Sequence, residues 1–415
     1  MPAKRFQLFA NKEMRILAIS LLFLGIGNAV TAPFLLLFGV EELGLGSGIF
    51  GTWIAANSLC GILVNTLLAK RSDSGFDRKK LIILASAFSV VAYIGCYLVY
   101  HDLRFLLLVI PVFLGLGAPA LPQIFAHARD ILNQSSDRRN SSSANALLRS
   151  LFSAGFLIGP LVGTFLLTQG GYNALFLGSA TMFLSFGILV LLFLKRSPAS
   201  AGSAAKVQGI GEQLKNRNIL FPFLALLLFF ASNSIYGIGG PLLITRQLQG
   251  SASYVGLASS ICAGLEIVTM LFLVLASRRV SNRHLLILGG VCSVMFFVIV
   301  ILSTQVWHIL AAQFFLAVFI AIATSIGISY FQDLLPNQSG VATTLYSNAA
   351  SFGMLLGNVG GGVLVEWLGY RNVFWFCLST ALTALVLFKL SKEEISSQTV
   401  VTERNQGSEG ELIHD

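Results

Sequence analysis

The amino-acid sequence predicts an all-α membrane protein with 12 transmembrane helices, arranged as two six-helix bundles related by a pseudo-two-fold axis. Three observations lead to this fold class. The 415 residues are 55% hydrophobic and only 11% charged, whereas soluble domains carry about 25% charged residues. The charges are separated by uncharged runs of the length that a bilayer requires, roughly 20 residues. The second half of the chain also repeats features of the first half in the same order.

The uncharged runs account for the twelve helices. Single crossings are predicted at 16–40, 43–69, 81–100, 105–126, 219–245, 247–277, 334–365 and 372–388, and double crossings at 150–194 and 284–332. We place the breaks in the double crossings at 168–173 and 303–305. Backbone groups in lipid must hydrogen-bond within their own segment, and the runs lack the alternation of barrel strands. We therefore expect helices, the first of which is retained because no signal-peptide cleavage site follows it.

The cationic residues fall mainly on one side of the membrane in this arrangement. Most of the 27 Lys and Arg lie in the N-terminal segment, the loops after helices 2, 4 and 8, the central linker and the tail. Cytoplasmic loops carry an excess of Lys and Arg, so both termini are expected in the cytoplasm. The net charge of +9 then reflects topology, and we expect no nucleic-acid partner.

The chain divides into four regions. Residues 195–218 are rich in Ser, Ala and Gly and carry several cations, which is typical of a flexible cytoplasmic linker. They separate an N-terminal six-helix bundle at 1–194 from a C-terminal bundle at 219–391. We expect residues 392–415 to form a disordered cytoplasmic tail.

The two bundles share four features at matching places: a proline in the first helix, an aspartate after the fourth, a glycine-rich segment in the fifth and a Gly-Tyr pair before the sixth. The matches are Pro33 with Pro241, Asp130 with Asp333, 159–163 with 357–361, and Gly171-Tyr172 with Gly369-Tyr370. Two six-helix repeats around a midplane site describe the major facilitator architecture of secondary transporters.

The loops carry no cofactor or catalytic motif. They contain no phosphate-binding loop, metal-ligand cluster or catalytic dyad, so we expect neither an enzyme nor an ATP-driven pump. All five cysteines fall within predicted helices, where we interpret them as packing residues. We expect no cofactor, and the proton-motive force is the predicted source of energy.

The loop after helix 2 carries a family resemblance. Asp77 precedes the cluster Arg78-Lys79-Lys80, which resembles the signature of the major facilitator superfamily at this place. Ala69 stands where a glycine is usual and the spacing is longer, which is similar to bacterial sugar efflux transporters. Segments 264–267, 330–336 and 340–348 resemble the same family.

This resemblance implies a monomeric transporter in the bacterial inner membrane that exports small neutral sugars. Gly155, Gly159, Pro160 and Gly163 resemble the helix-5 motif of exporters in the superfamily. Proline removes one backbone hydrogen bond and the glycines permit a bend and a close contact. The motif favours export, although an ordinary packing ridge would have the same pattern.

Glu266 is the strongest single candidate for a residue that takes part in transport. It lies about ten residues from the cytoplasmic end of helix 8, hence roughly 15 Å deep. A carboxylate at the middle of a bilayer is costly and usually faces a cavity or a partner. Glu266 is expected to bind sugar hydroxyls and to carry the coupled proton; the alternative is a structural ion pair.

Arg149 is the second charged candidate, at about 12–14 Å of depth in helix 5. Asn145 lies one turn earlier on the same face. The family resemblance implies that helices 5 and 8 are neighbours, so we hypothesise that Arg149 and Glu266 share a central cavity and pair in one transport state. Alternatively, Arg149 extends its charge toward the cytoplasm.

Neutral polar residues within the helices complete the predicted substrate site. They are Asn28, Asn57, Gln123, Asn233, Tyr236, Gln313, Tyr346 and Asn348. Amides and phenols bind hydroxyl groups both as donors and as acceptors, and few charges lie within the membrane. The set favours a neutral, hydroxylated substrate, although each residue taken alone fits an interhelical hydrogen bond better than a contact with a ligand.

The basic loop after helix 2 is a candidate cytoplasmic gate. Asp73 and Asp77 are expected to bond helix ends of the other half, and Arg78 and Lys79 to pair with acids there. The alternative is that these charges serve topology alone.

Two functions are compatible with these features of the sequence. The first is an antiporter that exports mono- or disaccharides or glycoside analogues in exchange for protons. The second is a multidrug/proton antiporter, which the 33 phenylalanines leave open. The predicted partners are therefore a small sugar and membrane lipid.

Overall fold

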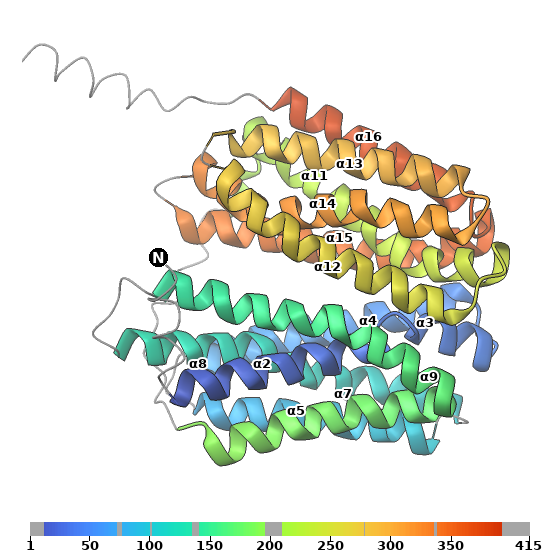
Figure 1. Ribbon diagram of the computed structural model, residues 1–415. Coiled ribbons are helices and arrows are strands. Elements are labelled where there is room, and N and C mark those ends of the chain that lie inside the picture. Colours follow the sequence, from blue (N-terminus) through green and yellow to red (C-terminus); the bar gives the residue numbers. More distant parts are fainter. Residues whose placement is uncertain are drawn as a thin grey trace, which may run out of the picture.

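The computed structural model describes residues 12–72, 77–99, 102–134, 141–195, 210–277, 279–335 and 338–391. Every regular element within these ranges is a helix. Figure 1 shows them as two groups, the helices up to α9 in one and those from α10 onward in the other.

The N-terminal half contains the first six crossings. The first consists of α2 (Lys12–Thr31), α3 (Leu35–Leu37) and the π-helix η1 (Phe38–Glu42). The second and third are α4 (Ser47–Ser72) and α5 (Arg78–Val99). The remaining elements are α6 (Leu103–Leu108), α7 (Ile110–Gly117), α8 (Ala120–Gln134) and α9 (Ser141–Phe193).

The C-terminal half repeats this order. A short helix, α10 (Ile210–Gln213), precedes α11 (Arg217–Leu242) and the π-helix η3 (Leu243–Gln247). The later crossings are α12 (Ala252–Ala276), α13 (Asn282–Leu302), α14 (Val306–Leu334), α15 (Ser339–Leu368) and α16 (Val373–Leu390). Helix α10 and the first residues of α11 fall inside the predicted linker 195–218, of which 196–209 lie outside the described residues, as does the predicted tail 392–415.

The predicted number of crossings is confirmed. Among the described residues, 11 helical segments are long and apolar enough to cross a membrane, and one of them, Leu148–Phe193, has 46 residues. Gly170 and Gly171 interrupt this segment with non-helical backbone angles, so it crosses twice. Both predicted breaks are correct, since α13 ends at Leu302 and α14 begins at Val306.

Glycine ridges pack the helices of each half at equivalent places. A side chain at Gly155 would come within 2.7 Å of Gly25 on α2, and one at Gly159 within 2.5 Å of Ala29. In the other half, a side chain at Gly357 would collide with Ala231 of α11 in the same way. Helices in lipid associate through such close contacts between small residues. The predicted repeat therefore extends to packing.

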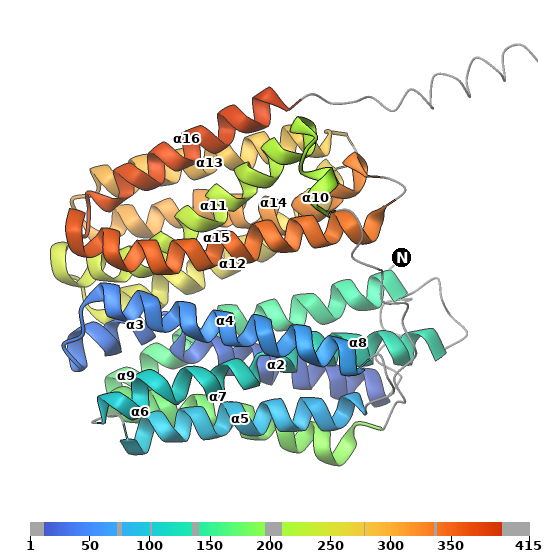
Figure 2. The same ribbon diagram turned by 180° about the vertical axis from the view of Figure 1, so that it is seen from behind.

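The two halves meet along two pairs of helices. Helix α9 contacts α12 on one face and α4 contacts α15 on the other, as the two opposite views show (Figures 1 and 2). We call the end of the molecule where α9 ends and α11 begins the linker end. The opposite end, where α4 begins and α15 ends, is called the Glu366 end.

Candidate transport site

A cavity of about 580 Å³ lies between the two halves. Helices α2 and α9 line it from the N-terminal half, and α11, α12 and α14 from the C-terminal half. The residues of the N-terminal half are Ala29, Ala32, Pro33, Phe152, Ser153, Phe156 and Pro160. Those of the C-terminal half include Asn233, Tyr236, Gly237, Ser259, Cys262, Glu266 and Gln313.

The polar groups are unequally divided between the halves. Apart from Ser153, the lining side chains of the N-terminal half are apolar. The amides, the phenol and the carboxylate all come from the C-terminal half. Asn233 and Tyr236 lie three residues apart on α11 and therefore share a face of that helix. One wall of the cavity can form many hydrogen bonds, and the facing wall offers apolar contact.

Tyr236 and Gln313 form a rigid pair in this wall. The Nε2 atom of Gln313 donates to Tyr236 Oη at 2.9 Å and to the backbone oxygen of Ile309 at 3.1 Å. Gln313 is only 1% exposed, and the Tyr236 ring packs edge-on against Phe296 with centroids 4.7 Å apart. Because the phenol oxygen accepts from Gln313, its own proton can be donated to a ligand in the cavity.

Glu266 is the one side chain with a full charge among the described residues that line the cavity. It lies on α12 one turn beyond Cys262, and both residues face the same space. The half-buried carboxylate can accept hydrogen bonds from hydroxyl groups or bind a proton. The structure thus places four predicted residues together: Asn233, Tyr236, Glu266 and Gln313.

Arg149 is not among the residues that line the cavity. It is exposed, and its guanidinium lies 5.9 Å from the centre of the Phe125 ring, a cation–π contact. Among the described residues it forms no ion pair with Glu266, so the hypothesised pairing does not occur in this state of the protein. The side chain of Asn145 lies outside the described part of the chain.

The remaining predicted ligands are not among the residues that line this cavity, so their contact with a substrate stays a prediction. Asn28 donates to the backbone oxygen of Leu24 in its own helix at 2.8 Å. Gln123 is buried and accepts from Arg78 at 3.3 Å. Tyr346 is buried and packs edge-on against Phe230. Asn57 and Asn348 are half-buried in α4 and α15 and are not among the lining residues.

The predicted gate residues contact their own half in this structure. Lys79 donates its Nζ to the backbone oxygen of Leu194 at 2.6 Å, so it caps the end of α9. Arg78 reaches Gln123 of α8, and Asp77 Oδ1 accepts from the backbone N–H of Lys79 at 3.0 Å. Asp73 lies outside the described residues. A contact of these residues with the other half remains a prediction for another state.

The C-terminal half has a contact equivalent to that of Lys79. Arg283, near the start of α13, donates to the backbone oxygens of Phe388 and Ser391 at 3.2 and 2.7 Å. Cations near a helix C-terminus satisfy its last carbonyl groups and its dipole. Lys79 and Arg283 thus join the third helix of each half to the sixth.

Several cavity residues were missed in the sequence. Phe152 and Phe156 of α9 are apolar and looked like ordinary lipid-facing or packing residues. Ser259, Cys262 and Glu266 lie three to four residues apart, hence on one face of α12. Because Glu266 was expected to face a cavity, this spacing could have identified Ser259 and Cys262 as cavity residues as well.

Known proteins with similar sequences are membrane transporters. The family model of the Major Facilitator Superfamily matches residues 17–243 and 222–409. The chain is 32% identical over 360 residues to sugar efflux transporter B of Salmonella typhimurium, covering 85% of this chain and 89% of that one. It is also 32% identical to sugar efflux transporter A of Escherichia coli over 371 residues, 88% and 92% of the two chains. Multidrug pumps among the relatives are less similar, at 22–25% identity.

The fold also matches a solved structure. The crystal structure of the nucleoside transporter NupG superposes with a TM-score of 0.78, covering 91% of this chain and 98% of that one. The sequence identity is 14%, so this likeness concerns the arrangement of the helices.

Proposed function

The chain belongs to the major facilitator superfamily, and we propose that within it the protein exports small neutral sugars by alternating access. The single observation that carries this proposal is the cavity between the halves, with Asn233, Tyr236 and Gln313 on one wall. Its volume of about 580 Å³ lies within the usual range for small-molecule sites, about 300–1,000 Å³. The identity of about 30% to several sugar efflux transporters supports sugar as the cargo.

The polar wall matches the chemistry of a sugar. Tyr236 donates to a ligand oxygen, Glu266 accepts from a ligand hydroxyl, and the amide of Asn233 can do both. Mono- and disaccharides or glycoside analogues present donors and acceptors of this kind on neighbouring carbons. A cargo without hydroxyl groups would leave the polar atoms of this wall unpaired, which costs free energy in a site closed to water.

The transport cycle requires an energy source, and we assign it to the proton-motive force. Glu266 is the group that would carry the proton, because no cation stands among the described residues that line the cavity and a buried carboxylate without such a partner is costly when charged. Binding of sugar and binding of a proton at one carboxylate would then exclude each other, which gives antiport. No bound cofactor is part of this scheme.

We further propose that the protein lies in the bacterial inner membrane with both termini in the cytoplasm. We expect it to act as a monomer. The distribution of Lys and Arg along the chain supports this orientation. The linker end then faces the cytoplasm, and the Glu366 end faces outward.

Efflux from loaded cells tests the function. Cells that express the protein are loaded with labelled lactose, a labelled glucose analogue or a cationic dye, and efflux is followed with and without an uncoupler. We expect uncoupler-sensitive sugar efflux, which the Tyr236→Phe variant weakens. Dye efflux without sugar efflux would contradict the proposal and support a multidrug antiporter instead.

A further inference from the structure

Helix α4 lacks a capping side chain of its own. Residue Gly46 precedes its first residue, Ser47, and a glycine has no side chain that could accept from the free N–H groups of the first turn. The acceptor comes from the other half: Glu366 Oε2 on α15 accepts from the backbone N–H of Gly48 at 3.1 Å. The carboxylate also lies where the helix dipole favours negative charge.

Glycines on both helices allow a close approach at this contact. A side chain at Gly48 would come within 2.7 Å of Glu366 Oε2, and one at Gly46 within 3.1 Å of Oε1. A side chain at Gly362 would lie 3.1 Å from the Cα atoms of both Gly48 and Gly51. Ser47 Oγ donates to the backbone oxygen of Gly362 at 3.0 Å. Backbone therefore meets backbone across the boundary between the halves.

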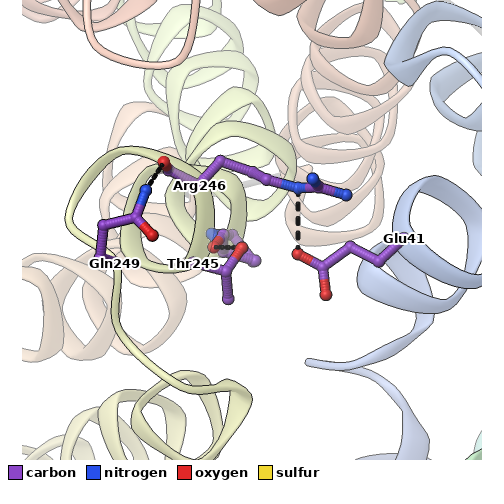
Figure 3. A network of polar contacts seen from close by, with 5 residues as sticks. Glu41, Thr245, Arg246 and Gln249 are labelled. Carbon is purple, nitrogen blue, oxygen red and sulfur yellow. Dashed lines mark hydrogen bonds and ion pairs between the residues drawn. The ribbon is translucent and has the colours of Figure 1, made fainter.

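A second polar contact joins the halves at the same end. Arg246 Nε lies 3.3 Å from Glu41 Oε1, and Figure 3 shows the two side chains reaching toward each other from separate helices. Glu41 belongs to η1 and Arg246 to η3, the π-helical ends of the first helix in each half. Both π-helices follow the repeated prolines, Pro33 and Pro241, that interrupt regular helical hydrogen bonding.

We propose that Glu366 is a reversible latch: it caps α4 across the two halves, keeps the Glu366 end closed in this state, and must leave Gly48 when the cavity opens there. The Glu41–Arg246 pair strengthens the closed state at the neighbouring helix ends. Both contacts involve exposed charges, which contribute modestly in water. A modest contribution suits a transporter, because a closed state held too strongly would stop the cycle. The inference rests on the two-halved fold and holds for any cargo.

Hydrogen exchange of the full-length protein in lipid nanodiscs tests the latch. The Glu366→Gln variant weakens the cap, so amides at 46–52 should exchange about two- to fivefold faster, the range expected for one exposed charge at a helix end. Amides at 270–276, at the linker end of α12, should exchange more slowly, because the linker end closes as the other end opens.

This opposite change at the two ends separates a latch from a merely structural contact. Asp102→Asn is the matched control, since Asp102 caps α6 within one half, through the backbone N–H groups of Arg104 and Phe105. It should leave 270–276 unchanged. Faster exchange at both ends in Glu366→Gln, or no change at either, would overturn the proposal.

Two further pairs of variants keep the test independent of folding defects. Gly362→Leu should force the same end open, whereas Gly360→Leu should not, because a side chain at Gly360 meets nothing within 4 Å.

Glu41→Gln should shift exchange in the same direction as Glu366→Gln. The same substitution at its exposed neighbour, Glu42→Gln, should not. Restoration of the wild-type pattern by the swap Glu41→Arg with Arg246→Glu is expected. Equal behaviour of Glu41→Gln and Glu42→Gln would contradict the contribution of the ion pair.

Discussion

At the scale of single residues, the cavity wall depends on how a few polar groups are held. Gln313 uses both hydrogens of its amide on Tyr236 and on the backbone of Ile309, which fixes the phenol and directs its proton to a ligand. Glu266 has a different role, because a carboxylate can gain or lose a proton during the cycle. These roles predict different consequences of substitution.

Tyr236→Phe should raise the KM for sugar efflux about tenfold, since a lost hydrogen bond in a closed site costs about 1–1.5 kcal/mol. The maximal rate should change little. Efflux at several internal sugar concentrations measures both. Tyr93→Phe is the control, because Tyr93 is buried and accepts from Thr31 at 3.0 Å, and it is not among the residues that line the cavity. If Tyr236→Phe had the wild-type KM, the phenol of Tyr236 would not be a sugar ligand.

Glu266→Gln should separate sugar movement from proton coupling. The amide keeps a hydrogen-bond acceptor of the same shape but cannot release a proton. We expect this variant to carry sugar down its gradient and to fail to export it against a gradient. Labelled-sugar flux in proteoliposomes with and without an imposed pH gradient measures this. Full uphill export by the variant would disprove the assignment of the proton to Glu266.

At the scale of elements, cations and glycines hold each half together. Lys79 caps α9 and Arg283 caps α16 from equivalent positions, and the glycine ridges of α9 and α15 lie against α2 and α11. The contacts of Lys79 in this state lie within one half, so its expected contribution is to stability.

Lys79→Met should lower the free energy of unfolding by about 1 kcal/mol, as expected for a charged group lost from a helix C-terminus. Lys80→Met should have little effect, because Lys80 is exposed. Thermal unfolding in detergent compares the two variants. If Lys79→Met instead left stability unchanged and altered only transport, the gate predicted from the sequence would be the better account.

Gly155→Ala should destabilise the N-terminal half, because the added carbon would lie 2.6 Å from the backbone nitrogen of Ile26. The helices would have to separate, at a cost of about 1–3 kcal/mol for overpacking. Gly360→Ala is the control, with open space around it. Equal melting temperatures for both variants would show that the ridge is not tightly packed.

At the scale of the whole molecule, the sequence predicted the crossings and the repeat well. Segment length, hydropathy and the matching of Pro33 with Pro241 are properties of the chain itself. It was harder to predict which polar residues line the cavity, because the direction in which a polar side chain points depends on its neighbours in the fold. Asn28 bonds its own helix and Gln123 meets Arg78, and neither contact has a signature in the sequence. The contact of Glu366 with Gly48 joins residues 318 positions apart, so local patterns do not indicate it.

The central claim is that sugar binds in the cavity between the halves, and Cys262 offers the most direct test because this residue lines that cavity. The rate at which N-ethylmaleimide alkylates each cysteine of the full-length protein can be measured by peptide mass spectrometry, with and without saturating lactose or a glucose analogue. We predict that sugar slows alkylation of Cys262 and leaves Cys60, which lies on α4 outside the cavity, unaffected. An unchanged rate at Cys262, or the same slowing at Cys60, would contradict the account.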